Sequence, residues 1–376
     1  MEKVKLKDLG EICTGNTPSK KNKEFYKNND ICFFKPSDID EDNIKLLNNS
    51  EEYISEMARN KARILPKGTI LVTCIGTIGK IGILEKESAC NQQINAIIPN
   101  NRIDGKYLAY LIYSKKMYLQ KKANAPVVPI INKTDFSNIE LNIYDQSTQI
   151  KIVNELDKVQ EIKDIRKKQI EELDELIKSQ FVEMFGDPIL NPKCFPLKKV
   201  EDIVEFQGGS QPDKKFFEYT KTKDNIRLIQ IRDYKTNDFI TYIPKNLAKR
   251  FCDEDDIMIG RYGPPIFQIL QGIKGSYNVA LMKAIPKKGN KEFVRYFLKQ
   301  ECLLHYLEGL SQRTAGQAGI EMPKLKKYPF PYPPIELQNK FADFVKQIDK
   351  QKFEIQKSLE EIQKLQESLM NKYFGG

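Results

Sequence analysis

The run QIKIVNELDK, which begins at Gln149, is echoed near the end of the chain by QNKFADFVKQ, which begins at Gln338. The two runs align without gaps at a constant offset of 189 residues (338 less 149), and the alignment ends with Phe185-Gly186 on Phe374-Gly375. A repeat of half the chain is longer than the units of about 20–50 residues that build solenoids. It indicates a duplicated module, each copy a globular part followed by a long helix. Two such copies can fold with internal two-fold symmetry.

Both repeated helices carry apolar residues at seven-residue intervals, a period that requires a facing helix to bury the seam. The predicted seam consists of Ile152, Val159, Leu173, Phe341, Ile348, Ile355, Ile362 and Leu369, with Ile162, Leu176 and Leu365 at neighbouring positions. Because a globular part lies between the helices in the chain, we expect an antiparallel coiled coil. The first three residues should then face Ile348, Ile355 and Ile362. The alternative is that each amphipathic helix packs separately on its own domain.

Glycine and proline divide the rest of the chain. The first 145 or so residues alternate short β-rich runs with Gly, Pro and Asn breaks, and the first long helix stops at Gly186-Asp187-Pro188. The Pro-rich run 328–334 reads as an extended strap before the second helix. The predicted fold is α+β, with target-recognition-sized domains of mixed α/β character at 1–146 and 187–333 and helical regions at 147–186 and 334–376.

Composition narrows the function. A chain of 376 residues is long enough for two globular cores, and its net charge of +10 fits nucleic acid, an anionic membrane surface or an acidic protein as partner. No apolar run approaches the ~20 residues that cross a bilayer, and Met1–Lys5 lacks an apolar signal region. The seven cysteines form no CxxC pair, as expected of reduced thiols. We therefore expect a cytoplasmic protein with no membrane partner.

Catalytic motifs are incomplete throughout the sequence. The single histidine, His305, lies in an apolar run and fits a packed core residue better than a ligand or base. The run Gly76–Lys80 lacks the first glycine and the Ser/Thr of a phosphate-binding loop. Neither Gly263–Ile266 nor Tyr332–Ile335 has the Asp/Asn-Pro-Pro-aromatic pattern of adenine methyltransferases, and Phe206–Ser210 misses their methyl-donor loop by one place. The sequence therefore predicts no catalytic residue, no metal site and no enzyme activity in this chain.

Basic and amide side chains on predicted loops are the candidates for contact with double-stranded DNA. Lys and Arg neutralise phosphates, Asn and Gln can pair with adenine, and Arg or Lys with guanine. The candidates are Lys20, Lys21, Lys23, Thr77, Lys80, Asn91, Gln92 and Gln93 in the first half, and Gln211, Lys214, Lys215, Arg261, Tyr262, Arg313 and Gln317 in the second. Any one of them fits a solvated loop equally well, but as a set on duplicated scaffolds they favour DNA.

Several of these runs together match a known family. They are Ile70–Lys80, Cys90–Ala96, the strap that leads into Ile335–Gln338, and the mid-chain ending Phe181–Pro188. Over essentially its whole length the chain resembles the specificity subunit of type I restriction–modification systems. It departs from the family pattern at Ile143-Tyr144-Asp145, where a Pro-Pro strap is usual. The second half also has Gly-Pro-Pro in place of the Gly-Thr-x-Gly loop and lacks the double Gln.

The resemblance implies a non-catalytic reader of DNA. Each of two target-recognition domains would bind one half of a split target, and the helical regions would form an antiparallel coil that sets the gap. The coil would dock two modification subunits, which use S-adenosylmethionine, and restriction/translocase subunits that hydrolyse ATP with magnesium would join them; this chain itself would hold no cofactor. Two alternatives remain open at this point: the recognition fragment of a single-chain methyltransferase–nuclease, and a coiled-coil interaction protein whose basic charge is incidental.

Overall fold

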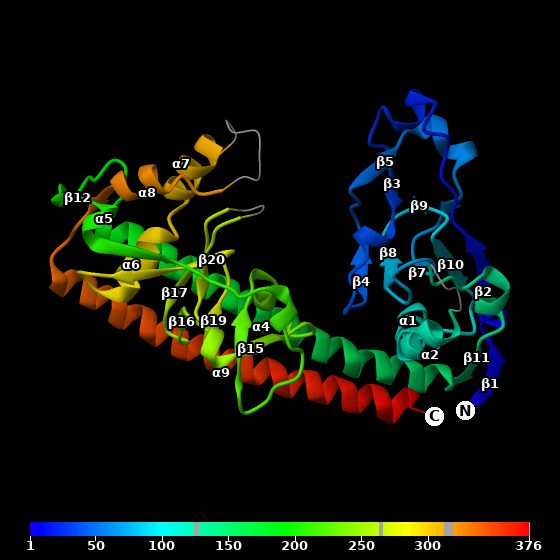
Figure 1. The fold of residues 1–376 in the computed structure, drawn as a ribbon. Helices are drawn as coiled ribbons and strands as arrows, with labels where there is room; N and C mark the ends of the chain where they lie inside the picture. The colour runs from blue at the N-terminus through cyan, green and yellow to red at the C-terminus, as the bar shows by residue number, and fades with distance from the viewer. Residues whose placement is uncertain (124–127, 263–265, 312–318, 376) are drawn as a thin grey trace. The chain divides into compact units, whose positions relative to one another are not determined.

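The computed structural model describes residues 1–123, 128–262, 266–311 and 319–375 (Figure 1). The chain forms two compact units, one of residues 1–167 and 357–376 and the other of residues 168–356. Two long helices, α4 (Gln146–Phe185) and α9 (Ile335–Phe374), contribute to both. Each unit therefore combines one globular part with the start of one long helix and the end of the other. Among the described residues, no helix has the length and apolar character that a bilayer span requires.

The first unit is built on two mixed sheets and a two-stranded ribbon. Their strand orders are β2-β10-β7-β8-β4, β5-β3-β9-β6 and β1-β11. The strands are β1 (Glu2–Lys5), β2 (Gly10–Thr14), β3 (Ile31–Phe34), β4 (Lys45–Leu47), β5 (Glu52–Ile54), β6 (Ile64–Leu65), β7 (Ile70–Thr73), β8 (Ile81–Leu84), β9 (Ser88–Cys90), β10 (Ile94–Pro99) and β11 (Glu140–Ile143). The helices are η1 (Leu6–Asp8), η2 (Lys23–Tyr26), η3 (Pro36–Asp38), η4 (Glu56–Lys61), α1 (Gly105–Ser114), α2 (Lys116–Lys122) and α3 (Lys133–Ser137).

The second unit repeats this topology. Its strand orders are β13-β20-β17-β18, β15-β14-β19-β16 and β12-β21. The strands are β12 (Leu197–Lys199), β13 (Val204–Gly208), β14 (Asn225–Ile229), β15 (Thr241–Pro244), β16 (Phe251–Cys252), β17 (Ile257–Gly260), β18 (Gln268–Gln271), β19 (Gly275–Tyr277), β20 (Leu281–Pro286) and β21 (Pro329–Pro331). The helices are α5 (Val200–Ile203), η5 (Lys214–Phe216), η6 (Ile231–Tyr234), η7 (Lys245–Leu247), α6 (Lys291–Leu298), α7 (Glu301–Ser311) and α8 (Met322–Lys327).

The duplication holds at the level of individual strand pairs. In each unit one pair is parallel, β3 with β9 in the first and β14 with β19 in the second, while the pairs flanking it are antiparallel. The most apolar strands, β7 and β17, are buried along their whole length. The difference is β4, which adds a fifth strand to the first sheet only. The shared scaffold therefore extends well beyond the helical run that reveals the repeat in the sequence.

The long helices run antiparallel within each unit. In the first, Lys163 Nζ donates to Gln363 Oε1 (2.7 Å) and Gln366 Oε1 (3.1 Å). In the second, Lys352 Nζ donates to Asp174 Oδ1 (2.6 Å). Lys163 and Lys352 lie 189 residues apart, as do Asp174 and Gln363, so the same contact is made twice. The coiled-coil partnership predicted from the heptads is thus present, and its polar contacts follow the repeat.

The predicted partners across the seam need a correction at the start of α4. Ile152 is buried in the same core as Phe374, with Leu369 packed against it. Ile348 belongs instead to the core of the second unit, against which Leu173 packs. Antiparallel packing brings the start of one helix to the end of the other, so Ile152 faces residues later in α9 than we expected.

Apolar residues at neighbouring heptad positions also depart from expectation. Ile162, Leu176 and Leu365 were expected beside the seam, but their exposed fractions are 47%, 44% and 50%. The other predicted seam residues are buried or half-buried. The seam is therefore narrower than the heptads suggest, and apolar side chains remain on the outer faces of both helices.

The repeated Phe-Gly ending of each long helix closes the core of one unit. Phe374, at the end of α9, packs on Tyr107 of α1 with ring centroids 5.5 Å apart. Phe185, at the end of α4, packs on Phe293 of α6 at 4.7 Å and on Phe341 of α9 at 5.5 Å. Each domain thus receives its closing aromatic from the helix that follows the other domain in the chain.

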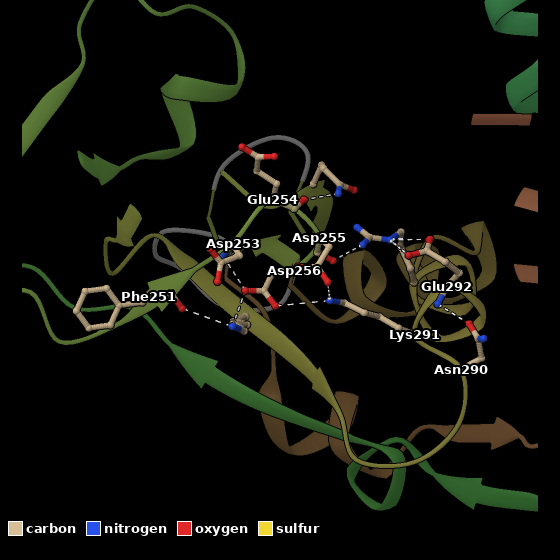
Figure 2. Close-up of polar contacts among 11 residues, drawn as sticks. Phe251, Asp253, Glu254, Asp255, Asp256, Asn290, Lys291 and Glu292 are labelled. Carbon is tan, nitrogen blue, oxygen red and sulfur yellow. Dashed lines mark hydrogen bonds and ion pairs between the residues drawn. The ribbon is translucent and has the colours of Figure 1, made fainter. Parts of the chain in front are cut away.

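An ion-pair network ties α6 to the loop before β17 (Figure 2). Lys291 Nζ lies 2.7 Å from Asp255 and 3.7 Å from Asp256, and Lys283 Nζ lies 2.5 Å from Asp256. Arg295 is buried, and it donates to the Asp255 carbonyl (2.7 Å). The ion pair with Lys291 lowers the pKa of Asp255. These carboxylates are occupied by cations, so the cluster fixes the loop and is not arranged as a metal site.

Removing the aromatic at the centre of the second unit should destabilise it strongly. Phe341 is fully buried and touches Phe181, Phe185 and Tyr296. Phe341→Ala should lower the free energy of unfolding by about 3–5 kcal/mol, because a cavity replaces packed rings. Phe353, 67% exposed on the same helix, is the matched control, and Phe353→Ala should change it by less than about 0.5 kcal/mol. Urea unfolding followed by circular dichroism measures both, and equal losses would contradict this account of the core.

Candidate nucleic-acid interface

Three loops of the first unit are joined by side-chain hydrogen bonds. Asn16, just after β2, donates to the Lys61 carbonyl (2.6 Å) and accepts from the Arg63 amide (2.6 Å). The Arg63 guanidinium donates back to the Thr14 carbonyl (2.8 Å). These bonds bring the end of β2 and the segment between η4 and β6 to one place, although about 45 residues of chain separate them.

Glycine allows the loop after β2 to lie against the loop after β9, and the second unit repeats the arrangement. A Cβ at Gly15 would lie 2.3 Å from the Asn91 carbonyl oxygen, and one at Gly209 would lie 1.9 Å from that of Asn278. Both distances are far below van der Waals contact, so only glycine fits. The close approach is a property of the scaffold and sets where the variable side chains begin.

The two asparagines beside these glycines serve the same local turn. Asn91 Oδ1 accepts from the Gln93 amide (3.1 Å), and Asn278 Oδ1 accepts from the Ala280 amide (3.1 Å). Both asparagines are buried, and Asn91 Nδ2 also donates to Gln93 Oε1 (2.9 Å). This geometry favours a structural role for Asn91 over a contact with a base. The exposed amide of the run is Gln92, whose Oε1 accepts from the Thr17 hydroxyl (2.6 Å).

The basic loop of the first unit presents its lysines outward. Lys20, Lys21 and Lys23 are exposed, and Lys20 Nζ lies 3.8 Å from Glu52. A hydrogen bond from Lys35 lowers the pKa of Glu52, so this carboxylate stays charged and holds part of the loop. The lysines therefore surround an anchored loop, with their ammonium groups available to a polyanion.

Thr77 and Lys80 differ in their availability. Thr77 is exposed between Gly76 and Gly79, which have φ values of +77° and +86°. Lys80 is half-buried, and its Nζ donates to the Pro36 carbonyl (3.4 Å). Its backbone amide donates to a threonine hydroxyl of β7. A phosphate contact through Lys80 would compete with these internal bonds, whereas Thr77 needs no rearrangement.

The second unit places its candidates on the equivalent loop and on the end of β17. Gln211 is half-buried, while Lys214 and Lys215 are exposed at the start of η5. Arg261 is half-buried, and its guanidinium donates to the Val279 carbonyl (3.3 Å) beside the Asn278 turn. The predicted residues Arg313 and Gln317 lie outside the described residues.

Cations beside exposed aromatics distinguish the second unit. Lys215 Nζ lies 5.1 Å from the centroid of the Phe216 ring, and the Arg261 guanidinium lies 5.2 Å from that of Tyr262. Both rings are about 40% exposed. A basic group next to an accessible ring is suited to a phosphate and a base together, because bases stack on aromatic faces. The adjacent pairs Lys-Phe and Arg-Tyr were a readable signal that reasoning on charge alone missed in the case of Phe216.

Arg63 is the functional candidate that the sequence did not reveal. It is exposed, and its head group is oriented by the Thr14 carbonyl within the same cluster as Asn16 and Gln92. Its guanidinium also opposes the rise that burial produces in the pKa of the Cys13 thiol. The contact joins residues 49 positions apart, so no local pattern could have indicated it.

The arrangement as a whole offers positive charge, amides and exposed rings on loops held by rigid turns. Within the described parts of the chain, no group of three or more His, Cys, Asp or Glu residues is placed to hold a metal ion. Such surfaces can neutralise phosphates and present donors and acceptors to base edges. They contain no described pair of groups poised for acid–base or nucleophilic chemistry.

Comparisons with known proteins agree with this geometry. A sequence profile described as "Type I restriction modification DNA specificity domain" matches residues 1–175 and 192–367. The chain is 26% identical over 408 aligned residues to the type I restriction enzyme MjaIX specificity subunit of Methanocaldococcus jannaschii, covering 99% of this chain and 92% of that protein.

Two solved structures share the fold over nearly the whole chain. The type I restriction–modification S subunit from M. genitalium has a TM-score of 0.53 and 16% identity, with 99% of this chain and 95% of that one covered. A chain from a structure that describes complex assembly and conformational transition of the type I R-M system has a TM-score of 0.56 and 16% identity, with coverage of 99% and 97%.

Exposed lysines at the two loops should govern a salt-dependent affinity for duplex DNA. Lys21→Ala and Lys214→Ala should each weaken binding to all sequences and reduce the slope of log K against log salt by about 0.9, the value for one phosphate contact. Lys80→Ala should change the slope less, because Lys80 Nζ is bonded to Pro36. Lys151→Ala, exposed on α4, is the control. Fluorescence anisotropy at several salt concentrations measures the slopes; unchanged slopes for Lys21 and Lys214 would remove these loops from the interface.

Proposed function

Because this chain belongs to the family of type I restriction–modification DNA specificity subunits, we propose that it is the non-catalytic subunit that reads a DNA target split into two half-sites. The observation that carries this proposal is the duplicated scaffold with diverged loops. The strand orders of the two units correspond pair by pair, while the side chains at equivalent loops differ. A shared scaffold with different loops is what two readers of different half-sites require.

The two loop sets are suited to different base contacts. The first unit gathers Asn16, Arg63 and Gln92, whose amide and guanidinium groups can hydrogen-bond to base edges in the major groove. The second gathers Lys215-Phe216 and Arg261-Tyr262, which combine a cation with a ring. The half-sites should therefore differ in sequence. The surrounding lysines would contribute affinity for phosphates without selecting bases.

The long helices are proposed to dock two modification subunits. Each unit has a hollow between the end of one long helix and a pair of short helices, α1 and α2 in the first and α6 and α7 in the second. Asp174 and Lys178 line one hollow, and their repeat counterparts Gln363 and Glu367 line the other. Two equivalent hollows on one chain are suited to two copies of one partner. Because Lys178 corresponds to Glu367, that partner would bind through shape and apolar contact more than through these charges.

The chemistry of such a system would reside in its other subunits. We propose that the modification subunits bind S-adenosylmethionine and that restriction/translocase subunits bind ATP and magnesium, in the cytoplasm. The incomplete methyltransferase and phosphate-loop motifs of this chain support that division of labour. This chain would position the target adenine for a partner without contacting the methyl donor. A single-chain enzyme fragment and an incidental coiled-coil protein are both less favoured, since the family profile matches both globular parts and most of both helices.

The spacing of the half-sites provides the decisive experiment. Four residues inserted into each long helix at the unit boundary, after Lys167 and after Gln356, add about 6 Å and about 40° beyond a full turn. One base pair adds ~3.4 Å and, at about 10.5 base pairs per turn, roughly 34°. Methylome sequencing of cells that express the chain with its modification subunits should show a split target whose spacer lengthens by one or two base pairs while both half-sites are unchanged.

Two outcomes would count against the proposal. An undivided target for the wild-type chain would remove the two-reader function. Altered half-sites with an unaltered spacer would show that the helices do not measure DNA. The same insertion into α4 alone is the control, because it shifts Asp174 relative to Lys352 or Lys163 relative to Gln363 and should abolish modification.

The exposed leucines of the long helices give a test of partner docking. Leu176 and Leu365 are repeat counterparts and are 44% and 50% exposed. Leu176→Arg or Leu365→Arg should each reduce the bound modification subunits from two to one, because a charge would replace an apolar contact at one of two equivalent sites. Native mass spectrometry counts the subunits, and Met57→Arg, 66% exposed on η4, is the control. Two bound subunits in both leucine variants would place the docking surface elsewhere.

A further inference from the structure

A buried glutamine occupies the fourth position of each long helix. Gln149 and Gln338 are repeat counterparts and are 1% and 0% exposed. A primary amide buried to this extent is retained only where both its donor and its acceptor are satisfied, since an unpaired buried polar group is costly. In both units the partners are backbone atoms that belong to the junction between the globular part and the helix.

The two glutamines make the same pair of bonds. Gln149 Oε1 accepts from the Asp104 amide (2.9 Å), and its Nε2 donates to the Tyr144 carbonyl (2.8 Å). Gln338 Oε1 accepts from the Asn290 amide (2.8 Å), and its Nε2 donates to the Pro333 carbonyl (2.8 Å). All four partners are main-chain atoms. The geometry has therefore persisted although the residues that supply those atoms have diverged.

The elements joined by these bonds are the ones that set how a domain meets its helix. Asp104 and Asn290 are the N-caps of α1 and α6, and their side chains cap the first turns of those helices. Tyr144 and Pro333 lie in the segments that enter α4 and α9. Each glutamine therefore fixes one short helix and one entering segment to the same point of a long helix. We call the pair of bonds made by each glutamine a junction latch.

Close packing on the second latch shows how little freedom it leaves. Gly289 has φ +82°, and a Cβ there would lie 2.7 Å from Gln338 Oε1. In the first unit, Ile103 occupies the equivalent place beside Asp104 and is buried. Both junctions are therefore filled, and a tilt of the domain at this point would break a buried hydrogen bond.

We propose that Gln149 and Gln338 are positioning residues that restrict the allowed spacer between the two half-sites, a role that rests on the proposed function. A rigid junction makes each domain meet DNA at one angle, so a spacer one base pair too short or too long leaves one reader out of register. The reading loops around Thr17 and Gln92, or Lys215 and Arg261, belong to other elements. Loss of a latch should therefore loosen the spacer without changing the half-sites.

The test uses the full chain, expressed with its modification subunits, and methylome sequencing. Gln149→Met and Gln338→Met keep the side-chain length but remove both bonds. Relative to the correct spacer, modification at spacers one base pair shorter or longer should rise about tenfold in each variant, which corresponds to about 1.4 kcal/mol of lost discrimination. The half-site sequences should not change. Gln351→Met, an exposed glutamine on α9, is the matched control and should retain the wild-type spacer.

The outcomes separate this inference from the function on which it rests. An undivided wild-type target refutes the proposed function. A split wild-type target, with variants that lose modification evenly and keep a single spacer, shows that the glutamines only stabilise the fold and overturns the inference. If a Met variant modifies nothing, Gln149→Glu and Gln338→Glu decide, because a carboxylate still accepts the N-cap amide but cannot donate to the entering segment. Intermediate broadening of the spacer supports the latch, and a single spacer refutes it.

Discussion

The packing of each helix end against the domain of the opposite half is the constraint on which the rest of the structure depends. Phe185 closes the core beneath α6, and Phe374 closes the one beneath α1. Neither globular part therefore completes its core from its own continuous stretch of chain. Burial of these rings, worth several kcal/mol each, requires the long helices to run in opposite directions within each unit. The antiparallel arrangement follows from core completion as much as from the heptads.

Sequence reasoning succeeded where a repeat could be compared with itself. The offset of 189 residues predicted that Lys163 and Lys352 have equivalent environments, and both donate across the helix pair. It failed where burial depends on neighbours distant in sequence. Ile162 follows the heptad and is nevertheless half exposed, since no facing side chain covers it at that point. Periodicity indicates which face is apolar but not how wide the covered strip is.

The candidate interface shows a similar division. The basic loop after β2 could be located from composition, because lysines between Gly and Pro breaks rarely have another place than the surface. The roles within the loops could not. Asn91 has the residue type expected of a base reader, yet its amide is bonded within its own turn, as Asn278 is in the other unit. Arg63 gave no signal at all, because its orientation comes from Thr14. Residue type narrows the candidates, but hydrogen bonding decides which of them remain available.

The contact between the long helices is duplicated in position but not in charge. Lys352 meets the Asp174 carboxylate at a partly exposed site, whereas Lys163 is buried and meets two glutamine carbonyl groups. Counterions screen an exposed ion pair but have little effect on a buried contact with neutral groups. The two ends of a symmetric scaffold should therefore respond unequally to ionic strength, the second unit loosening first. An internally duplicated protein can in this way keep its symmetry of shape while giving its halves different sensitivities to the surrounding solution.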